Sequence, residues 1–511
     1  MIKFFLNYLK NNFFLDKNEK KFIQKFSNIK KQKNYNNNKV IFVNIAMDYA
    51  HLAEISFMLQ NKKFYDSKIV GIWNYNIHPS WKNSYLKERL ISIKNFFINY
   101  FFKKKWIKIY KSIGINEVVD TSQRSLFEDY KFKTKSKKLI KKIKKFDKNK
   151  FLKLKIKNII VGDLIVDTYI RFRNIQTIQF NDSFLLEIIK KFMISQSNIE
   201  KTIKKFKPRT FLLSYSNYSS GVVARTALEH KVNVFCTGDT MSYLKRLTKN
   251  DTNTHTSYRN FKNLFKPIKL KEQKYKKSRI ELKKRFTGIN DQAYSYMKKN
   301  PYKKNSKKLT FKVDGVLFLH DFFDTPHHFK SMIFFDFYEW SLYSLKIIDK
   351  YNLNIAIKPH PNSIYQNKII IEDLKNMFPK IKWIDPEITN KEIFKSKIKF
   401  GISVYGSVLY ELVYHNLVAI ASTPYHPTYN YDIVYTPKNK NEYRDLLINS
   451  KKLKSKRNTK QKIEEFYYMW TFYNHDALKE TSRVIDLKNI NFSSSKSLIQ
   501  YLKKLKIYEN K

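Results

Sequence analysis

The chain has 511 residues, with 100 Lys and Arg against 43 Asp and Glu, for a formal net charge of +57. This length predicts two domains. The single cysteine, Cys236, excludes an intramolecular disulfide and a cysteine-based metal cluster, which fits a reducing cytoplasm. No uncharged apolar run reaches the roughly eighteen residues of a transmembrane helix, and the start of the chain lacks the features of a secretory signal.

The positive charge is carried almost entirely by lysine, and Asn, Ile, Phe and Tyr are also abundant. This joint enrichment is typical of an AT-rich coding sequence. Base reading and bidentate phosphate recognition rely on arginine, and no nucleic-acid motif is visible, so we expect no nucleic-acid partner. A solvated lysine surface and attraction to an anionic membrane surface both remain compatible with this composition.

Residues 1–38 are basic and rich in asparagine, and we expect them to form an N-terminal extension. Residues 39–46 then predict a buried strand, 47–54 a turn into a helix, and 68–73 a second strand. This order opens a Rossmann-like domain that we expect to span residues 39–265.

A long helical stretch over residues 86–113 mixes aromatic side chains with lysines, most densely between Phe96 and Lys108. A basic aromatic helix of this kind is typical of a membrane surface. The alternative is that its aromatic side chains face the domain core, and the sequence leaves both open. Further along, Tyr218 and Arg225 follow a predicted strand at 210–214, where they are candidates for holding an acceptor.

Residues 266–309 are polar and lysine-rich, and we expect a linker. A second domain over 310–460 alternates strands and helices in a doubly wound α/β pattern. Residues 461–511 are charged and helical, and we expect a C-terminal helical tail.

Two loops of the second domain follow short apolar strands. Residues 355–362 read Ile-Ala-Ile-Lys-Pro-His-Pro-Asn, and residues 401–411 run through small residues into a helix. In open parallel sheets ligands bind beyond the carboxyl ends of the strands, and backbone N–H groups at a helix start bind anions. We therefore expect a nucleotide phosphate near these loops, whose candidate residues are Lys358, His360, Asn362, Ser403, Gly406, Ser407 and Glu411.

Lys-Pro-His-Pro at 358–361 and Gly-Ser-x-x-x-Glu at 406–411 resemble the donor half of GT-B glycosyltransferases that build bacterial surface polysaccharide. The similar group is the capsule-synthesis one, which includes Kdo transferases and polysialyltransferases. The resemblance covers roughly residues 310–440, although 415–421 lacks the Gly-x-Pro that the family often has there. It implies two Rossmann-like doubly wound domains facing across a cleft.

The resemblance also implies roles for single residues. His360 would contact the nucleotide phosphate as a candidate general acid, Ser407 would supply the hydroxyl, and Glu411 would reach the ribose. The alternative for Glu411 is a carboxylate that complements the helix dipole. Lys358 would neutralise phosphate charge or, alternatively, is one of many surface lysines.

The resemblance places acceptor-side catalytic groups in the first loop of the N-terminal domain, where this chain has Asp48 and His51. An aspartate there also suits a helix N-cap. The run from His320 to His328 includes Asp321, Asp324 and His327, which are side chains that bind metals. Because GT-B enzymes characteristically need no metal, we expect His320, Asp321, His327 and His328 to line the cleft instead.

The resemblance thus implies a metal-independent glycosyltransferase without cofactors, peripheral on the cytoplasmic face of the membrane. It would move a sugar from a nucleotide-sugar donor to a saccharide or lipid-linked saccharide acceptor, in capsule or lipopolysaccharide synthesis. One alternative is a polyol-phosphate transferase of the CDP-glycerol type. Another is a non-catalytic scaffold of polysaccharide assembly with the same fold.

Overall fold

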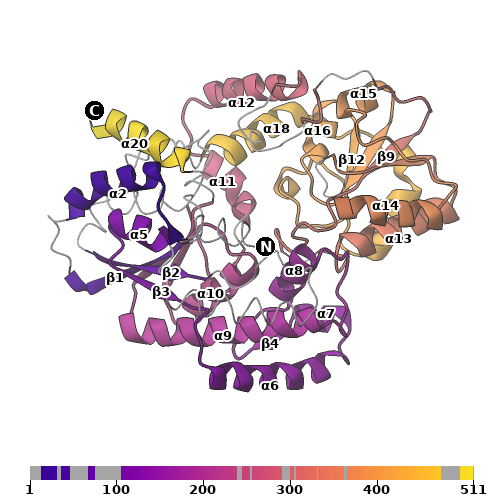
Figure 1. Cartoon of the computed structure of the whole chain (residues 1–511). Coiled ribbons are helices and arrows are strands. Elements are labelled where there is room, and N and C mark those ends of the chain that lie inside the picture. The colour runs from indigo at the N-terminus through magenta and orange to yellow at the C-terminus, as the bar shows by residue number, and fades with distance from the viewer. Residues whose placement is uncertain are drawn as a thin grey trace. The chain divides into compact units, whose positions relative to one another are not determined.

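The chain forms two compact units, whose elements are labelled in Figure 1. Unit 1 comprises Met1–Thr168, Phe180–Thr254 and His475–Lys511, and unit 2 comprises Tyr169–Gln179 and His255–Asn474. The computed structural model describes residues 13–30, 36–45, 67–74, 105–238, 244–253, 256–289, 300–303, 307–330, 332–361, 365–473 and 495–509.

Unit 1 is built on a six-stranded sheet in the order β3-β2-β1-β6-β7-β8. All neighbours pair in parallel except β7 and β8. Taken in chain order, this is the 3-2-1-4-5-6 arrangement of a Rossmann sheet, with its reversal between β1 and β6. The strands are β1 (Asn36–Ile45), β2 (Ser67–Trp73), β3 (Glu117–Asp120), β6 (Thr210–Leu213), β7 (Asn233–Cys236) and β8 (Lys245–Arg246).

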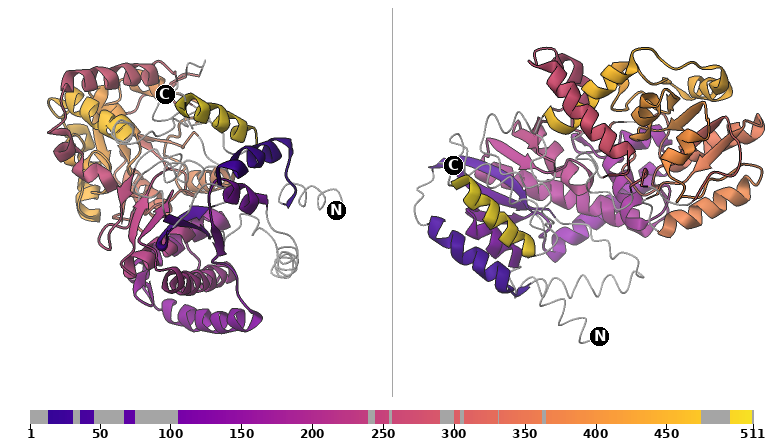
Figure 2. Two further views of the ribbon diagram at one scale, coloured as in Figure 1. Left: turned by 90° about the vertical axis from the view of Figure 1, so that its left-hand side faces the viewer. Right: turned by 90° about the horizontal axis from the view of Figure 1, so that it is seen from above.

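Both faces of this sheet are covered by helices, because alternate residues of a strand point to opposite sides. Ile41 and Val43 of β1 belong to a core formed with α2, α5 and α20, whereas Val40 and Phe42 belong to a core formed with α9 and α10. Figure 2 shows yellow α20 beside indigo α2. These helices are α2 (Lys17–Lys30), α5 (Lys105–Ser112), α9 (Ser183–Phe206), α10 (Tyr218–Glu229) and α20 (Lys496–Glu509).

Between β3 and α9 the chain forms three further helices and a small antiparallel pair of strands. The elements are α6 (Leu126–Ile143), α7 (Lys148–Leu152), β4 (Lys155–Ile156), β5 (Ile159–Ile160) and α8 (Gly162–Arg173). Helix α6 lies along α9, on the outside of unit 1 (Figure 1).

Unit 2 has a four-stranded parallel sheet in the order β10-β9-β11-β12. The chain adds β10 on one side of β9 and then β11 on the other, so the topological switch point lies between β9 and β11. Val316 and Phe318 of β9 pack in a core with α12, α16 and α18, and by strand alternation Leu317 faces the other way. The strands are β9 (Gly315–Phe318), β10 (Ile355–Lys358), β11 (Phe400–Ser403) and β12 (Val418–Ala421).

The helices of unit 2 surround this sheet and follow the alternation expected of a doubly wound fold. They are α11 (Phe261–Phe265), α12 (Lys271–Phe286), α13 (Phe337–Lys350), α14 (Tyr365–Met377), α15 (Asn390–Lys395), α16 (Val408–Tyr414), α17 (Lys440–Ile448) and α18 (Thr459–Tyr468). The prediction of an α/β chain with two Rossmann-like units is therefore confirmed. The predicted cleft between them stays a prediction.

The units differ in detail from the expected boundaries. The stretch expected as a linker contains α12, whose Tyr275 and Leu282 are buried in the core of unit 2. The expected tail is divided, since α18 belongs to unit 2 and α20 to unit 1. Within the expected N-terminal extension, α2 buries Phe22 completely in unit 1.

The described part of the basic aromatic stretch packs inward. In α5, Ile109 and Tyr110 are buried in the core of unit 1, and Lys105 forms an ion pair of 2.8 Å with Glu19. This part therefore follows the core alternative, and Phe96 lies outside the described residues. Among the helices that the structure describes, none combines the length and apolarity needed to span a bilayer.

Candidate functional site

Three loops of unit 2 meet at the carboxyl edge of its sheet. Because β9 lies between β10 and β11, the loops that follow these three strands are neighbours. They carry His320 after β9, His360 after β10, and Gly406 with Ser407 after β11. The edge includes the topological switch point, which is where open α/β sheets bind ligands.

His320 is held by aromatic rings and keeps one polar atom unused. Its imidazole stacks on Phe337, with ring centroids 4.7 Å apart and planes 9° apart, and lies 4.8 Å from the ring of Tyr405. Its Nε2 atom is buried and has no hydrogen-bond partner among the described residues. Burial lowers the pKa of His320, and the charge of His360 lowers it further. The ring is therefore neutral at pH 7, with one buried nitrogen that a ligand would satisfy.

Gly406 lies next to this nitrogen. A Cβ atom at Gly406 would be 3.6 Å from His320 Nε2 and 3.3 Å from Ser403 Oγ. The Ser403 hydroxyl donates to the Phe318 carbonyl at 3.2 Å, so it joins the end of β11 to the end of β9. A Cβ atom there would also be 3.7 Å from Val408, so even a methyl group at Gly406 would be in van der Waals contact with the atoms around the imidazole.

At the end of β10, Lys358 is buried and His360 is partly buried. Burial lowers the pKa of His360, to which the charge of Lys358 adds, while Asp321 and Asp324 act in the opposite direction. Lys358 is 3% exposed, and its Nζ donates to the Pro386 carbonyl at 3.0 Å. Burial lowers the pKa of Lys358 to about 8. Lys358 is therefore a buried cation behind the edge of the sheet and not a surface lysine.

Glu411 is engaged inside unit 2. It is 1% exposed, and its carboxylate accepts hydrogen bonds from Arg285 Nε at 2.9 Å and from the Tyr302 hydroxyl at 2.6 Å. Arg285 also donates to Ser407 Oγ at 3.2 Å. Because both carboxylate oxygens are occupied, the geometry favours a structural role for Glu411, joining α16 to α12, over a ribose contact.

The acidic residues of the loop after β9 have separate partners. Asp321 Oδ1 accepts from Asn367 Nδ2 at 2.8 Å, and Asp324 Oδ1 accepts from the Thr325 amide at 2.9 Å. The buried His327 packs edge-on against Phe335, and the ring of His328 lies against that of Phe329. Burial lowers the pKa of His328.

In the part of the chain that is described, no group of three or more metal-binding side chains could hold an ion. Metal independence itself stays a prediction.

Two cations that the sequence analysis missed lie near the same edge. The Arg259 guanidinium and Lys330 Nζ lie 5.4 Å and 5.1 Å from the ring of Tyr425, which follows β12. Phe329, the neighbour of Lys330, contacts Tyr405 at 4.7 Å and so connects this group to the His320 side of the site. An arginine in a chain whose basic residues are mostly lysine was the available signal, because arginine suits phosphate recognition.

In unit 1, the predicted acceptor residue Arg225 is 8% exposed and makes two hydrogen bonds, of 2.7 and 2.6 Å, to the Asp163 carboxylate. This pairing favours a structural role. Tyr218 begins α10 with a left-handed φ of 53°.

Asn74, which the sequence analysis did not single out, follows β2 and accepts hydrogen bonds from Thr121 and Ser195 at 2.8 and 2.7 Å. The predicted site residues Asp48, His51 and Asn362 lie outside the described residues.

No protein-family model matches the chain, and no curated protein sequence is similar to it. Among solved structures, the chain is similar to UDP-GlcNAc 2-epimerase from Neisseria meningitidis bound to UDP-GlcNAc, with 10% identity, a TM-score of 0.26, and coverage of 87% of this chain and 98% of that one. It is similar to the epimerase of Methanocaldococcus jannaschii, with 12% identity, a TM-score of 0.26 and coverage of 92% and 99%. It is also similar to the Streptomyces glycosyltransferase SsfS6, with 6% identity, a TM-score of 0.26 and coverage of 86% and 99%. Similarities this weak are not evidence for a family or a function. The fold assignment therefore depends on the strand order of the chain itself.

Proposed function

We propose that the chain is a glycosyltransferase of the GT-B type that uses a nucleotide-sugar donor in the synthesis of bacterial surface polysaccharide. The observation that carries the proposal is the meeting of His320, His360 and Gly406 at the switch point of the parallel sheet of unit 2. A buried imidazole whose Nε2 has no hydrogen-bond partner among the described residues, next to the bare backbone of Gly406, suits a ligand rich in oxygen acceptors.

The charges around the edge suit a phosphorylated donor. Arg259 and Lys330 lie over Tyr425, and Lys358 lies buried at the end of β10. Such fixed positive charges stabilise the negative charge that builds on a departing phosphate, as a divalent metal does elsewhere. In our proposal they take the place of a metal and no cofactor is needed.

The proposed reaction is a substitution at the anomeric carbon of the donor sugar. An acceptor hydroxyl forms the new C–O bond, the bond from that carbon to the phosphate oxygen breaks, and the nucleotide leaves with the electron pair. A base takes the hydroxyl proton. We propose Asp48 or His51 for the base and a saccharide or lipid-linked saccharide for the acceptor, at the cytoplasmic face of the membrane.

Calorimetry with uridine, guanosine and cytidine nucleotides tests the donor site. We expect at least one to bind, and His360→Ala to weaken it about ten-fold or more through the loss of a hydrogen bond to a charged group. His415→Ala, which alters another partly buried histidine of unit 2, is the matched control and should leave the affinity unchanged. If no nucleotide binds to the wild-type chain, the scaffold alternative is favoured.

Donor hydrolysis and transfer assays separate the remaining alternatives. Release of nucleotide from a nucleotide-sugar, in excess EDTA, is the expected result. Turnover of a CDP-polyol donor without turnover of any nucleotide-sugar would favour the polyol-phosphate alternative. Activity that is lost to the chelator and restored by one added metal would contradict the metal-independent reaction.

A further inference from the structure

Three large apolar side chains project from the first turn of α6. Leu126, Phe127 and Tyr130 are 88%, 74% and 71% exposed, the three highest values among the large hydrophobic side chains that the structure describes. Tyr130 is four positions after Leu126 and three after Phe127, and side chains at these spacings are neighbours on a helix surface, so Tyr130 connects the three into a single patch. A cluster of exposed apolar side chains on an otherwise charged surface marks an interaction site.

The rest of the outward face of α6 is basic. Ser136 and Ile143 are its buried residues and define the side that packs on unit 1. After Asp129 the helix contains no acidic residue. The exposed lysines of α6 are Lys131, Lys135, Lys137, Lys138, Lys141 and Lys142.

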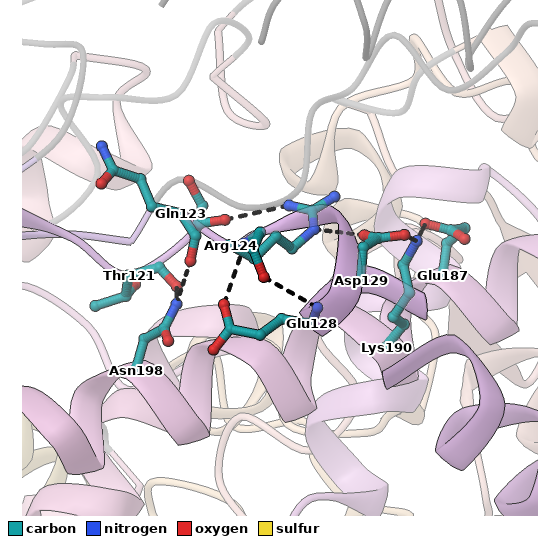
Figure 3. A network of polar contacts seen from close by, with 10 residues as sticks. Thr121, Gln123, Arg124, Glu128, Asp129, Glu187, Lys190 and Asn198 are labelled. Atoms are coloured by element: carbon teal, nitrogen blue, oxygen red, sulfur yellow. Dashed lines mark hydrogen bonds and ion pairs between the residues drawn. The ribbon is translucent and has the colours of Figure 1, made fainter. Parts of the chain in front are cut away.

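The two acidic residues of the first turn both have basic partners on α9. Glu128 pairs with Lys201 at 2.8 Å. Asp129 pairs with Lys190 at 3.3 Å and with Arg124 (Figure 3). The outward face is therefore positive without a compensating carboxylate, which is complementary to an anionic surface.

The same contacts fix the first turn in place. Ser125 and Glu128 form a capping box, and Asn198 of α9 donates to the carbonyls of Thr121 and Gln123 at 2.9 and 2.6 Å. Figure 3 shows Asn198 below Thr121 and Gln123, the residues that precede the helix. The capping box and the Asn198 hydrogen bonds therefore fix the backbone at the start of α6, so that Leu126, Phe127 and Tyr130 project from an ordered turn.

We propose that the outward face of α6 docks on an anionic lipid bilayer. Leu126, Phe127 and Tyr130 enter the interfacial layer, and the lysines contact the headgroups. A helix that binds a protein groove carries apolar residues along its whole length, whereas here they are confined to one turn. Nucleic acids and phosphopeptides are recognised mainly by arginine, and the outward face of α6 has only lysine. The proposal is independent of the nucleotide site and of the stretch around Phe96.

Cosedimentation of the full chain with vesicles tests this proposal. We expect binding to phosphatidylcholine vesicles that contain phosphatidylserine, little binding to phosphatidylcholine alone, and weaker binding at high salt because charges are screened. Replacing Lys137, Lys138, Lys141 and Lys142 by glutamine should lower the partition coefficient about 600-fold, at roughly five-fold per lysine. Changing Leu126, Phe127 and Tyr130 to glutamine should lower it about ten-fold or more while the salt dependence remains.

A charge-matched control uses four exposed lysines of unit 2, Lys276, Lys283, Lys346 and Lys380, each changed to glutamine. This variant should keep most of the binding. An equal loss in the control would mean that net charge alone attracts the protein, and the proposal would be overturned. Binding to an acidic protein or a polynucleotide but to no vesicle would assign the face to another partner.

Site-specific labelling gives a direct readout of insertion. The natural thiol, Cys236, is buried, so Phe127→Cys can be labelled selectively with a polarity-sensitive dye. Its emission should shift to shorter wavelength with anionic vesicles, whereas the same dye at Lys276→Cys should not respond. A label at position 127 that stays in water while the protein sediments with vesicles would overturn the docking of α6.

Discussion

His320 and Gly406 lie together at the ends of the paired strands β9 and β11, where a Cβ atom on Gly406 would lie 3.6 Å from His320 Nε2. In the described part of the chain this buried nitrogen has no hydrogen-bond partner. A buried polar group without a partner lowers stability, so its presence next to the bare backbone of Gly406 points to a role in binding. Each of the two residues can be changed in a way that separates binding from folding.

His320→Phe should keep the stack on Phe337 while removing the unpaired nitrogen. We expect the free energy of unfolding to stay the same or to rise by up to about 1 kcal/mol, because a buried polar atom is replaced by an apolar one. Nucleotide affinity should fall about ten-fold or more. Urea unfolding and calorimetry on the same preparation measure both, and unchanged affinity would mean that the ring is only a packing element.

Gly406→Ala should weaken nucleotide binding, because the new methyl group would lie 3.6 Å from His320 Nε2 and hinder a ligand atom from reaching it. Stability should change by less than about 1 kcal/mol, because the nearest contacts of the new methyl group are 3.3 to 3.7 Å. Gly401→Ala on β11 is the control, since its Cβ would lie 2.4 Å from Leu412 and should cost about 1–3 kcal/mol by overpacking. Full nucleotide affinity in Gly406→Ala would contradict the proposed position of the ligand.

The sequence predicted the strands and the loops of the site because both depend on local patterns. Buried runs such as 355–358 mark parallel strands, and polar residues immediately after them, such as His360, lie at the ligand-binding edge. The role of Glu411 did not follow, because its partner Arg285 is 126 positions away and comes from a stretch that reads as a linker. The orientation of His320 was also hidden, since stacking on Phe337 is set by packing and not by spacing.

Nucleotide affinity should fall as the pH rises through about 8. The pKa of Lys358 is lowered to about 8 by burial, so the ammonium is present below that pH and lost above it. A bound phosphate favours the charged form, and binding near pH 8 should therefore take up protons. Calorimetry in buffers of different ionisation enthalpy measures that uptake. Lys358→Met should abolish it and bind at neutral pH as weakly as the wild type does at high pH. Uptake that persists in Lys358→Met would assign the titration to another group.

Arg285→Met should destabilise unit 2 by about 3–5 kcal/mol, because it leaves the buried Glu411 carboxylate without its cation. The double variant Arg285→Met/Glu411→Met should recover most of this loss in urea unfolding. If Glu411 is structural, the folded double variant keeps its nucleotide affinity. An affinity that falls ten-fold or more in the double variant would instead restore Glu411 to the donor site.

Stability should fall as the pH drops below about 6.5, partly through His426. This histidine is 1% exposed, its ring nitrogens lie 3.0 Å from Thr428 Oγ1 and 2.8 Å from Thr436 Oγ1, and burial lowers its pKa to about 3. Between its folded pKa and the ordinary histidine value the unfolded chain binds the extra proton, so acid favours unfolding.

The effect of His426 can be measured at two pH values. Because the unfolded chain binds this proton, the free energy of unfolding should be about 2 kcal/mol lower at pH 5 than at pH 7.5. This difference is nearly the same for any folded pKa below about 4. His426→Gln should lower stability at both pH values, because neither threonine contact is fully replaced, but the difference between the two should shrink by about that amount. Urea unfolding at each pH gives both differences. An equal pH dependence in the variant would mean that His426 is already protonated in the folded state or that its environment opens before unfolding.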